Sequence, residues 1–184
     1  MKILSIVSDR HPALRKKSTE IKFPLEKHIT DLAKKMREYL INSQDYSFLE
    51  KHPRVRTGVG LAAPQIGKNI RMFAVYFENN DEKFYDFVLI NPRVTSRSAT
   101  LSYLAAGEGC LSVDIDHPGF VVRNASITIE GYDVMTSQNV KLELGGYPSI
   151  VFQHEFDHLD GILFYDRIDK ENPTKPIDGA IVIE

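Results

Sequence analysis

Residues 145–161 read GGYPSIVFQHEFDHLDG, and this sequence predicts both the end of a sheet and the helix that packs against it. The glycines and the proline at its start follow a run of strand-like residues, which predicts that a β-sheet ends here. Apolar and polar side chains then recur in a helical window from Ile150 to Leu159. Gly161 follows at the place where glycine commonly ends a helix. We therefore expect a helix that packs against a sheet.

The same helix carries the pattern H-E-x-x-H between His154 and His158. Residues four apart lie on one face of a helix, so both imidazoles can reach one metal ion. Glu155, one position further round the helix, can approach a water in the open coordination position and accept its proton. The alternative is a solvated helix with two surface histidines, which the interleaved apolar residues disfavour.

A catalytic metal site of this kind needs three protein ligands and one open position. Downstream, the longer pattern H-E-x-x-H-x-x-G-x-x-H fails, because Phe164 occupies the place of its third histidine. A late acidic ligand has little support, since the acids after His158 lie on no recognisable ligand helix. Cys110, the only cysteine, lies upstream in GEGCLS, where glycines let a ligand approach the backbone. Thiolates bind borderline and soft ions strongly, so we predict Cys110 as the third ligand, with a buried structural thiol as the alternative.

A third segment, residues 58–65, reads GVGLAAPQ. It lacks the lysine of a phosphate-binding loop, which makes a nucleotide site a weak interpretation. Its glycines favour the exposure of backbone N–H and C=O groups to an extended peptide, which binds by strand addition. Gln65 would then supply an amide donor for an oxyanion. Taken alone, the segment is explained equally well as an ordinary tight turn.

The remaining pattern predicts an α+β fold: mostly antiparallel β-sheets packed around a central metal-binding α-helix, with an N-terminal amphipathic helix. That first helix is expected from Pro24 to Leu40, where apolar residues follow a proline at helical spacing. Residues 42–56 are polar and charged, which indicates a surface excursion. Val, Ile, Phe and Tyr are enriched in the expected strands, which are residues 72–77, 84–91, 119–122, 125–131 and 139–144.

Length and composition limit the class of protein. The 184 residues suit a single catalytic domain, 1–184, in which residues 170–184 form a short C-terminal tail. A net charge of −2 gives no polybasic surface for nucleic acid. No apolar run is long enough to cross a bilayer, and the first ten residues lack the pattern of a signal peptide. The single cysteine fits a reducing compartment, so we expect a cytoplasmic protein.

Together, the segments GVGLAAPQ, EGCLS and QHEFDHLDG resemble the three signature motifs of peptide deformylases in order and content. The segment between Met36 and Arg56, and the residues GYPSIVF, resemble the second bacterial class, which is common in Gram-positive-type sequences. The resemblance covers the chain from about His11 to Asp169. It implies removal of the formyl group from the N-terminal formyl-methionine of nascent polypeptides, with release of formate.

The resemblance also implies a role for each motif residue. Its metal ligands are Cys110, His154 and His158, and its catalytic residues are Glu155 as general base with Gln65 and the Leu111 N–H as oxyanion donors. Its substrate-binding residues are Val59, Gly60 and Gly109 along the peptide backbone, and Glu108, Tyr147, Ile150 and Val151 around the methionine side chain. Ferrous iron is the native ion that it implies, with zinc, nickel or cobalt able to replace it.

The partners that the resemblance implies are N-formylmethionyl nascent peptides, with the ribosome exit region as a further candidate. We expect a monomer without a nucleic-acid or membrane partner. One rival function is a zinc-dependent endopeptidase built on the same H-E-x-x-H helix, which would keep its metal through a downstream ligand. The other is a non-enzymatic module in which the metal only stabilises the fold.

Overall fold

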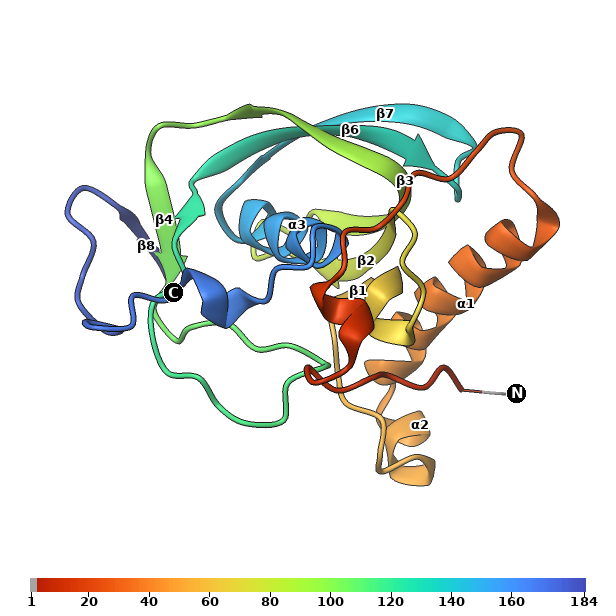
Figure 1. Ribbon diagram of the computed structural model, residues 1–184, viewed down its shortest axis with the longest axis horizontal. Coiled ribbons are helices and arrows are strands. Elements are labelled where there is room, and N and C mark those ends of the chain that lie inside the picture. Colours follow the sequence, from red (N-terminus) through yellow and green to blue (C-terminus); the bar gives the residue numbers. More distant parts are fainter. Residues whose placement is uncertain (1–2) are drawn as a thin grey trace.

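Helix α3, Gly146–Leu159, lies at the centre of the computed structural model, which describes residues 3–184 (Figure 1). The helix begins directly after a strand, where Gly146 adopts a φ of 60°, and it is followed by Gly161 with a φ of 76°. His154 is 9% exposed and His158 is 1% exposed. The alternative of surface histidines on a solvated helix is therefore wrong, because α3 is enclosed by the rest of the chain.

A five-stranded antiparallel sheet covers this helix, with the strand order β1-β2-β3-β6-β7. Its strands are β1 (Gly60–Ala62), β2 (Met72–Glu78), β3 (Phe84–Arg97), β6 (Ser126–Asp133) and β7 (Gln138–Gly145). The α+β class and the antiparallel sheet around a central helix are confirmed. Strand β3 extends six residues beyond its predicted end, past irregularities in its register with β6.

Strand β2 is buried on both faces because a helix packs against each of them. Met72 and Ala74 belong to the apolar cluster beneath α1, whereas Phe73 and Val75 belong to the cluster around α3. The ring of Phe73 meets that of Phe152 edge to face, with 5.8 Å between the centroids. This packing fixes the helix against the sheet.

Helix α1, Lys27–Ser43, covers the other face of the sheet, with Met36 and Leu40 fully buried. Its predicted start at Pro24 is wrong, since Glu26 is still extended with a ψ of 149°. Leu25 packs against the α1 cluster without being helical, which explains why the apolar spacing continued past the true boundary. Within the expected surface excursion lies a short helix, α2 (Tyr46–Lys51), none of whose residues is buried.

A second, three-stranded sheet contains β4 (Leu101–Leu104), β5 (Arg123–Asn124) and β8 (Ile181–Ile183) in the order β5-β4-β8. The strand predicted over residues 119–122 is wrong, because Phe120 N–H donates to the carbonyl of Pro173 at 2.8 Å instead of joining a sheet. The expected tail, residues 170–184, also differs, since β8 pairs in parallel with β4.

The described part of the chain also contains three 3-10 helices, at Pro12–Arg15 (η1), Ala63–Ile66 (η2) and Phe164–Arg167 (η3). None of the helices within residues 3–184 combines the length and the apolar character that crossing a bilayer requires.

Candidate metal centre

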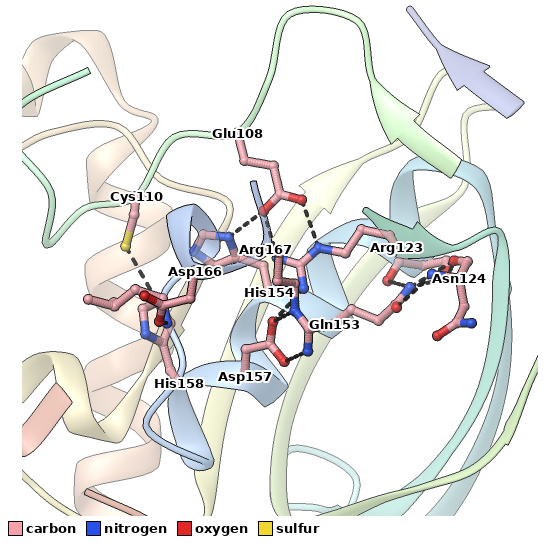
Figure 2. Close-up of polar contacts among 12 residues, drawn as sticks. Glu108, Cys110, Arg123, Asn124, Gln153, His154, Asp157, His158, Asp166 and Arg167 are labelled. Carbon is pink, nitrogen blue, oxygen red and sulfur yellow. Dashed lines mark hydrogen bonds and ion pairs between the residues drawn. The ribbon is translucent and has the colours of Figure 1, made fainter. Parts of the chain in front are cut away.

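Three ligand atoms from distant parts of the chain meet beside α3. The sulfur of Cys110 and one ring nitrogen each of His154 and His158 all lie within 4.8 Å of one another. Cys110 comes from the loop between β4 and β5, and its Sγ is 3.4 Å from Nε2 of His158 (Figure 2). A tetrahedral ion bound to a thiolate and an imidazole separates S and N by roughly 3.5 Å. The donor set therefore fits a divalent metal ion of the zinc or iron type.

A buried ionic network holds one of the two histidines, His154. Nδ1 of His154 lies 2.8 Å from a carboxylate oxygen of Glu108, which leaves Nε2 as the nitrogen that faces the ligand cluster (Figure 2). Arg123 donates two hydrogen bonds of 2.8 Å to the same carboxylate and a third to Asp157. Arg167 completes the chain with two bonds of 2.6 Å to Asp157. The network orients His154 through side chains that are themselves fixed.

The charges in this network are set by mutual contact. Burial alone would raise the pKa of Glu108, but Arg123 and His154 outweigh it and lower the pKa to about 2. Burial likewise opposes the charged form of His154, yet contacts with Cys110 and Glu108 raise its pKa well above the ordinary value. Glu108 is therefore ionised at neutral pH and accepts a hydrogen bond from the imidazole.

Glu155 lies outside this network, and its carboxylate oxygen Oε2, like Nδ1 of His158, has no hydrogen-bond partner among residues 3–184. Burial, with the nearby negative charge of Glu108, raises its pKa to about 7 against the attraction of His154 and Arg123. The backbone of Gly60 lies so close that a Cβ there would be 2.2 Å from Oε1 of Glu155. A side chain at residue 60 would thus displace this carboxylate, and this steric limit explains why residue 60 is a glycine.

Gln65 projects from η2 with both ends of its amide held. Oε1 accepts a hydrogen bond from the Ala62 N–H at 2.7 Å, and Nε2 lies 3.4 Å from both the Cys110 sulfur and the Ser112 hydroxyl. The accepting end is therefore satisfied by the backbone, while the donating end faces the ligand cluster. This orientation suits an amide that donates to a negatively charged oxygen.

A cavity of about 310 Å³ opens beside these groups. Twelve of the thirteen predicted site residues line it, which are Val59, Gly60, Gln65, Glu108, Gly109, Cys110, Leu111, Tyr147, Ile150, Val151, His154 and Glu155. His158 lies behind the cavity wall, 1% exposed. The tight-turn alternative for residues 58–65 explains only part of the segment, since β1 and η2 both occur within it.

Sequence reasoning missed several residues around the site. Arg123 and Arg167 complete the ionic network, and Arg56 and Leu104 add to the cavity wall. The two arginines of the network are separated in sequence from the carboxylates that they bind. No local spacing indicates that an arginine pairs with a buried carboxylate. Leu104 belongs to β4, which is not among the expected strands.

The raised pKa of Glu155 predicts a pH-dependent stability of the metal-free protein, prepared with a chelator. Because the folded-state pKa is about 7 and the ordinary value is 4.5, the folded protein binds more protons between these values. Stability should therefore fall as pH rises through that range. The measurement is the difference in free energy of unfolding between the parent and Glu155→Gln, from urea titrations. We expect this difference to change by about 3 kcal/mol, against the parent, as the pH rises from the ordinary pKa to the folded-state pKa. A difference that is independent of pH would contradict this.

A buried sulfur and two imidazole nitrogens, beside a buried carboxylate at the cavity wall, are the groups that a metal-dependent hydrolase requires. Comparison with known proteins identifies the family. Residues 3–174 match the family model described as polypeptide deformylase. The chain is 49% identical to a peptide deformylase of Staphylococcus epidermidis over 97% of each chain. It is 47% identical to peptide deformylase 2 of Bacillus subtilis over 98% of this chain and 97% of that one.

Solved structures agree with this result. A peptide deformylase from Thermus thermophilus matches with a TM-score of 0.70 and 34% identity, over 91% of this chain and 87% of that one. A probable peptide deformylase from the Synechococcus phage S-SSM7 matches with a TM-score of 0.71 and 34% identity, over 90% and 99%. The chain belongs to the peptide deformylase family, whose metal-dependent enzymes remove the N-terminal formyl group from nascent polypeptides. The endopeptidase alternative is not favoured.

Proposed function

We propose that Cys110, His154 and His158 hold the metal of this deformylase and that Glu155 moves the proton. The observation that carries the proposal is the meeting of the three ligand atoms within 4.8 Å, beside a cavity that also contains the Glu155 carboxylate. A divalent ion bound there supplies Lewis acidity, which lowers the pKa of a coordinated water from about 15.7 towards about 7. The products of the reaction are formate and a free N-terminal amine.

Glu155 acts as the general base and then as the acid. Its carboxylate takes a proton from the water that attacks the formyl carbon, and it passes that proton to the amine nitrogen as the C–N bond breaks. The absence of a hydrogen-bond partner at Oε2 within the described chain leaves this oxygen ready to accept. Burial raises the pKa of Glu155 to about 7 in the metal-free protein, and the positive charge of a bound ion would lower it again, which favours the carboxylate form that accepts the proton.

The negative charge that develops on the formyl oxygen is stabilised by two donors. Nε2 of Gln65 faces the ligand cluster, as its hydrogen-bond geometry supports. The second donor is the backbone N–H of Leu111, whose residue lines the cavity next to Cys110. Removal of one such donor commonly costs about 10²- to 10³-fold in rate.

The substrate peptide extends the main sheet at its β1 edge. The Val59 carbonyl accepts from the Tyr76 N–H at 2.9 Å, so the backbone groups of the next residue, Gly60, point away from β2. Because β1 is the last strand of the sheet, these groups are free to pair with an extended peptide on the cavity side. Gly109 would pair with the opposite side of the peptide. The methionine side chain would enter the part of the cavity that is lined by Glu108, Tyr147, Ile150 and Val151.

Ferrous iron is the native ion that we propose, on the strength of the family resemblance alone, because a ligand set of one thiolate and two imidazoles would favour zinc by intrinsic affinity. Zinc, nickel or cobalt would also fit these donors. Iron bound beside a thiolate makes the activity oxygen-sensitive, and equal half-lives of the iron-loaded enzyme with and without oxygen would count against iron.

Formate release from a formyl-Met-Ala-Ser peptide tests the assignment, with metal content measured alongside. We expect release by the protein loaded anaerobically with iron, and loss of the metal or of nearly all activity in Cys110→Ser. A zinc endopeptidase that uses a downstream ligand would instead retain its metal in this variant and would cleave internal peptide bonds. Failure of the loaded parent to release formate would overturn the proposal.

We further propose a single catalytic domain, 1–184, that acts as a monomer in the cytoplasm on nascent chains near the ribosome exit region. The continuous match over residues 3–174 supports the single domain. The one cysteine supports a reducing compartment.

A further inference from the structure

Arg56 makes a set of contacts that the roles described above do not use. It lies two residues before Gly58, the first residue of the segment that contains β1, and its guanidinium reaches the loop that carries Cys110. Nη2 donates to the carbonyl oxygen of Cys110 and, at 3.1 Å, to that of Val113. Nη1 also reaches the Val113 carbonyl at 3.1 Å and the carboxylate of Asp114 at 2.8 Å. One side chain thus holds three acceptors within five residues.

Two of these acceptors, the Cys110 and Val113 carbonyls, belong to a tight turn. The Val113 N–H donates to the Cys110 carbonyl at 3.2 Å, which closes the turn, and Arg56 binds both carbonyls of that turn. Asp114, with a side chain 79% exposed, balances the charge of the arginine, which is 44% exposed. The arginine therefore does not offer a free positive charge to a substrate.

The geometry of the peptide bond links this contact to catalysis. The carbonyl of Cys110 and the N–H of Leu111 belong to the same planar, trans peptide unit, so they point in opposite directions. When Arg56 fixes the carbonyl, it also fixes the direction of the Leu111 N–H, which points away from the arginine. A hydrogen bond from a charged donor also polarises the peptide unit and strengthens its N–H as a donor.

We propose that Arg56 is a positioning residue that aims the Leu111 N–H at the formyl oxygen. This inference rests on the proposed function, in which the Leu111 N–H is an oxyanion donor. Arg56 touches neither the reacting atoms nor the metal ligand atoms. It acts through the orientation of one peptide plane.

The test compares Arg56→Met with Arg54→Met, a matched control at an exposed arginine two residues away. Because a misaimed donor loses part of an oxyanion contact, we expect kcat per bound metal to fall about 10- to 100-fold in Arg56→Met, with KM within about twofold. Arg56→Lys keeps the charge but loses the two-pronged guanidinium, so its kcat per bound metal should lie between that of Arg56→Met and that of the parent. Arg54→Met should match the parent.

A second readout does not depend on turnover. In zinc-loaded protein labelled with 15N-leucine, we expect the Leu111 amide resonance, assigned by its loss in Leu111→Met, to shift in Arg56→Met and to stay in place in Arg54→Met. The inference would be overturned if the Leu111 resonance of Arg56→Met did not shift, or if the kcat of this variant equalled that of the parent. It would also be overturned if loss of metal alone explained the lower kcat. If Arg56→Met does not fold, Arg56→Lys carries the comparison. If the parent releases no formate, the proposed function fails, and the resonance alone decides this inference.

Discussion

Glu155→Gln is expected to lower kcat for formate release by about 10²- to 10⁴-fold while the protein keeps its fold and its metal. The substitution preserves the shape of the side chain but removes its capacity to take a proton. Because Oε2 of Glu155 has no hydrogen-bond partner in residues 3–184, the amide breaks no existing contact. The measurement is single-turnover formate release, normalised to metal content, since loss of metal imitates loss of catalysis.

Glu143→Gln is the matched control, because Glu143 lies exposed on β7, away from the cavity. It should retain the parental kcat. A Glu155→Gln enzyme that keeps its metal and more than about a tenth of the parental rate would remove Glu155 from the role of base. A parent that binds metal, folds and shows no turnover would instead favour the module in which the metal only stabilises the fold.

Arg123→Met is expected to lower the free energy of unfolding by about 3 to 5 kcal/mol. Arg123 is 1% exposed at its side chain, and it lies between the carboxylates of Glu108 and Asp157, which are 4% and 7% exposed. Removal of the guanidinium leaves Glu108 with the His154 imidazole as its one remaining partner in the described network. An uncompensated buried charge of this kind costs far more than an exposed ion pair contributes.

Urea denaturation of the metal-loaded proteins measures this effect, with Arg93→Met as the control. Arg93 pairs with Glu20 at the surface, with side chains 72% and 58% exposed, so its loss should cost less than about 1 kcal/mol. Replacing Glu108 with Gln in the Arg123→Met background should recover part of the loss, because the unpaired charge is then gone. Equal destabilisation by the two arginine variants would show that the buried network contributes no special stability.

The parts of this fold that the sequence predicted are those with local, repeated patterns. Helix α3 follows from apolar spacing between two glycine boundaries, and strands β2, β3, β6 and β7 from runs of β-branched and aromatic residues. Strand β8 was missed because three residues carry no periodicity, and its partner β4 lies nearly eighty residues earlier in the chain. Long-range pairing of short strands is decided by tertiary contacts that no local window contains.

In the candidate site, too, the residues that could be predicted are those with a local signal in the sequence. The spacing of His154 and His158 on one helix is a local signal, and the glycines beside Cys110 marked that residue as different from a core thiol. Arg123 gave no such signal, because its role depends on a carboxylate fifteen residues before it and another thirty-four residues after it. The supporting residues of a site are therefore harder to predict than its ligands.

If the substrate binds at β1 as proposed, the position of this strand at the end of its sheet sets a time limit on the reaction. A substrate joins that edge by offering its own backbone N–H and C=O groups, and these are free only while its first residues are unfolded. Once the new protein's leading segment has formed its own helix or strand, those groups are already occupied. Deformylation by this enzyme is thus in competition with the folding of the chain that it processes.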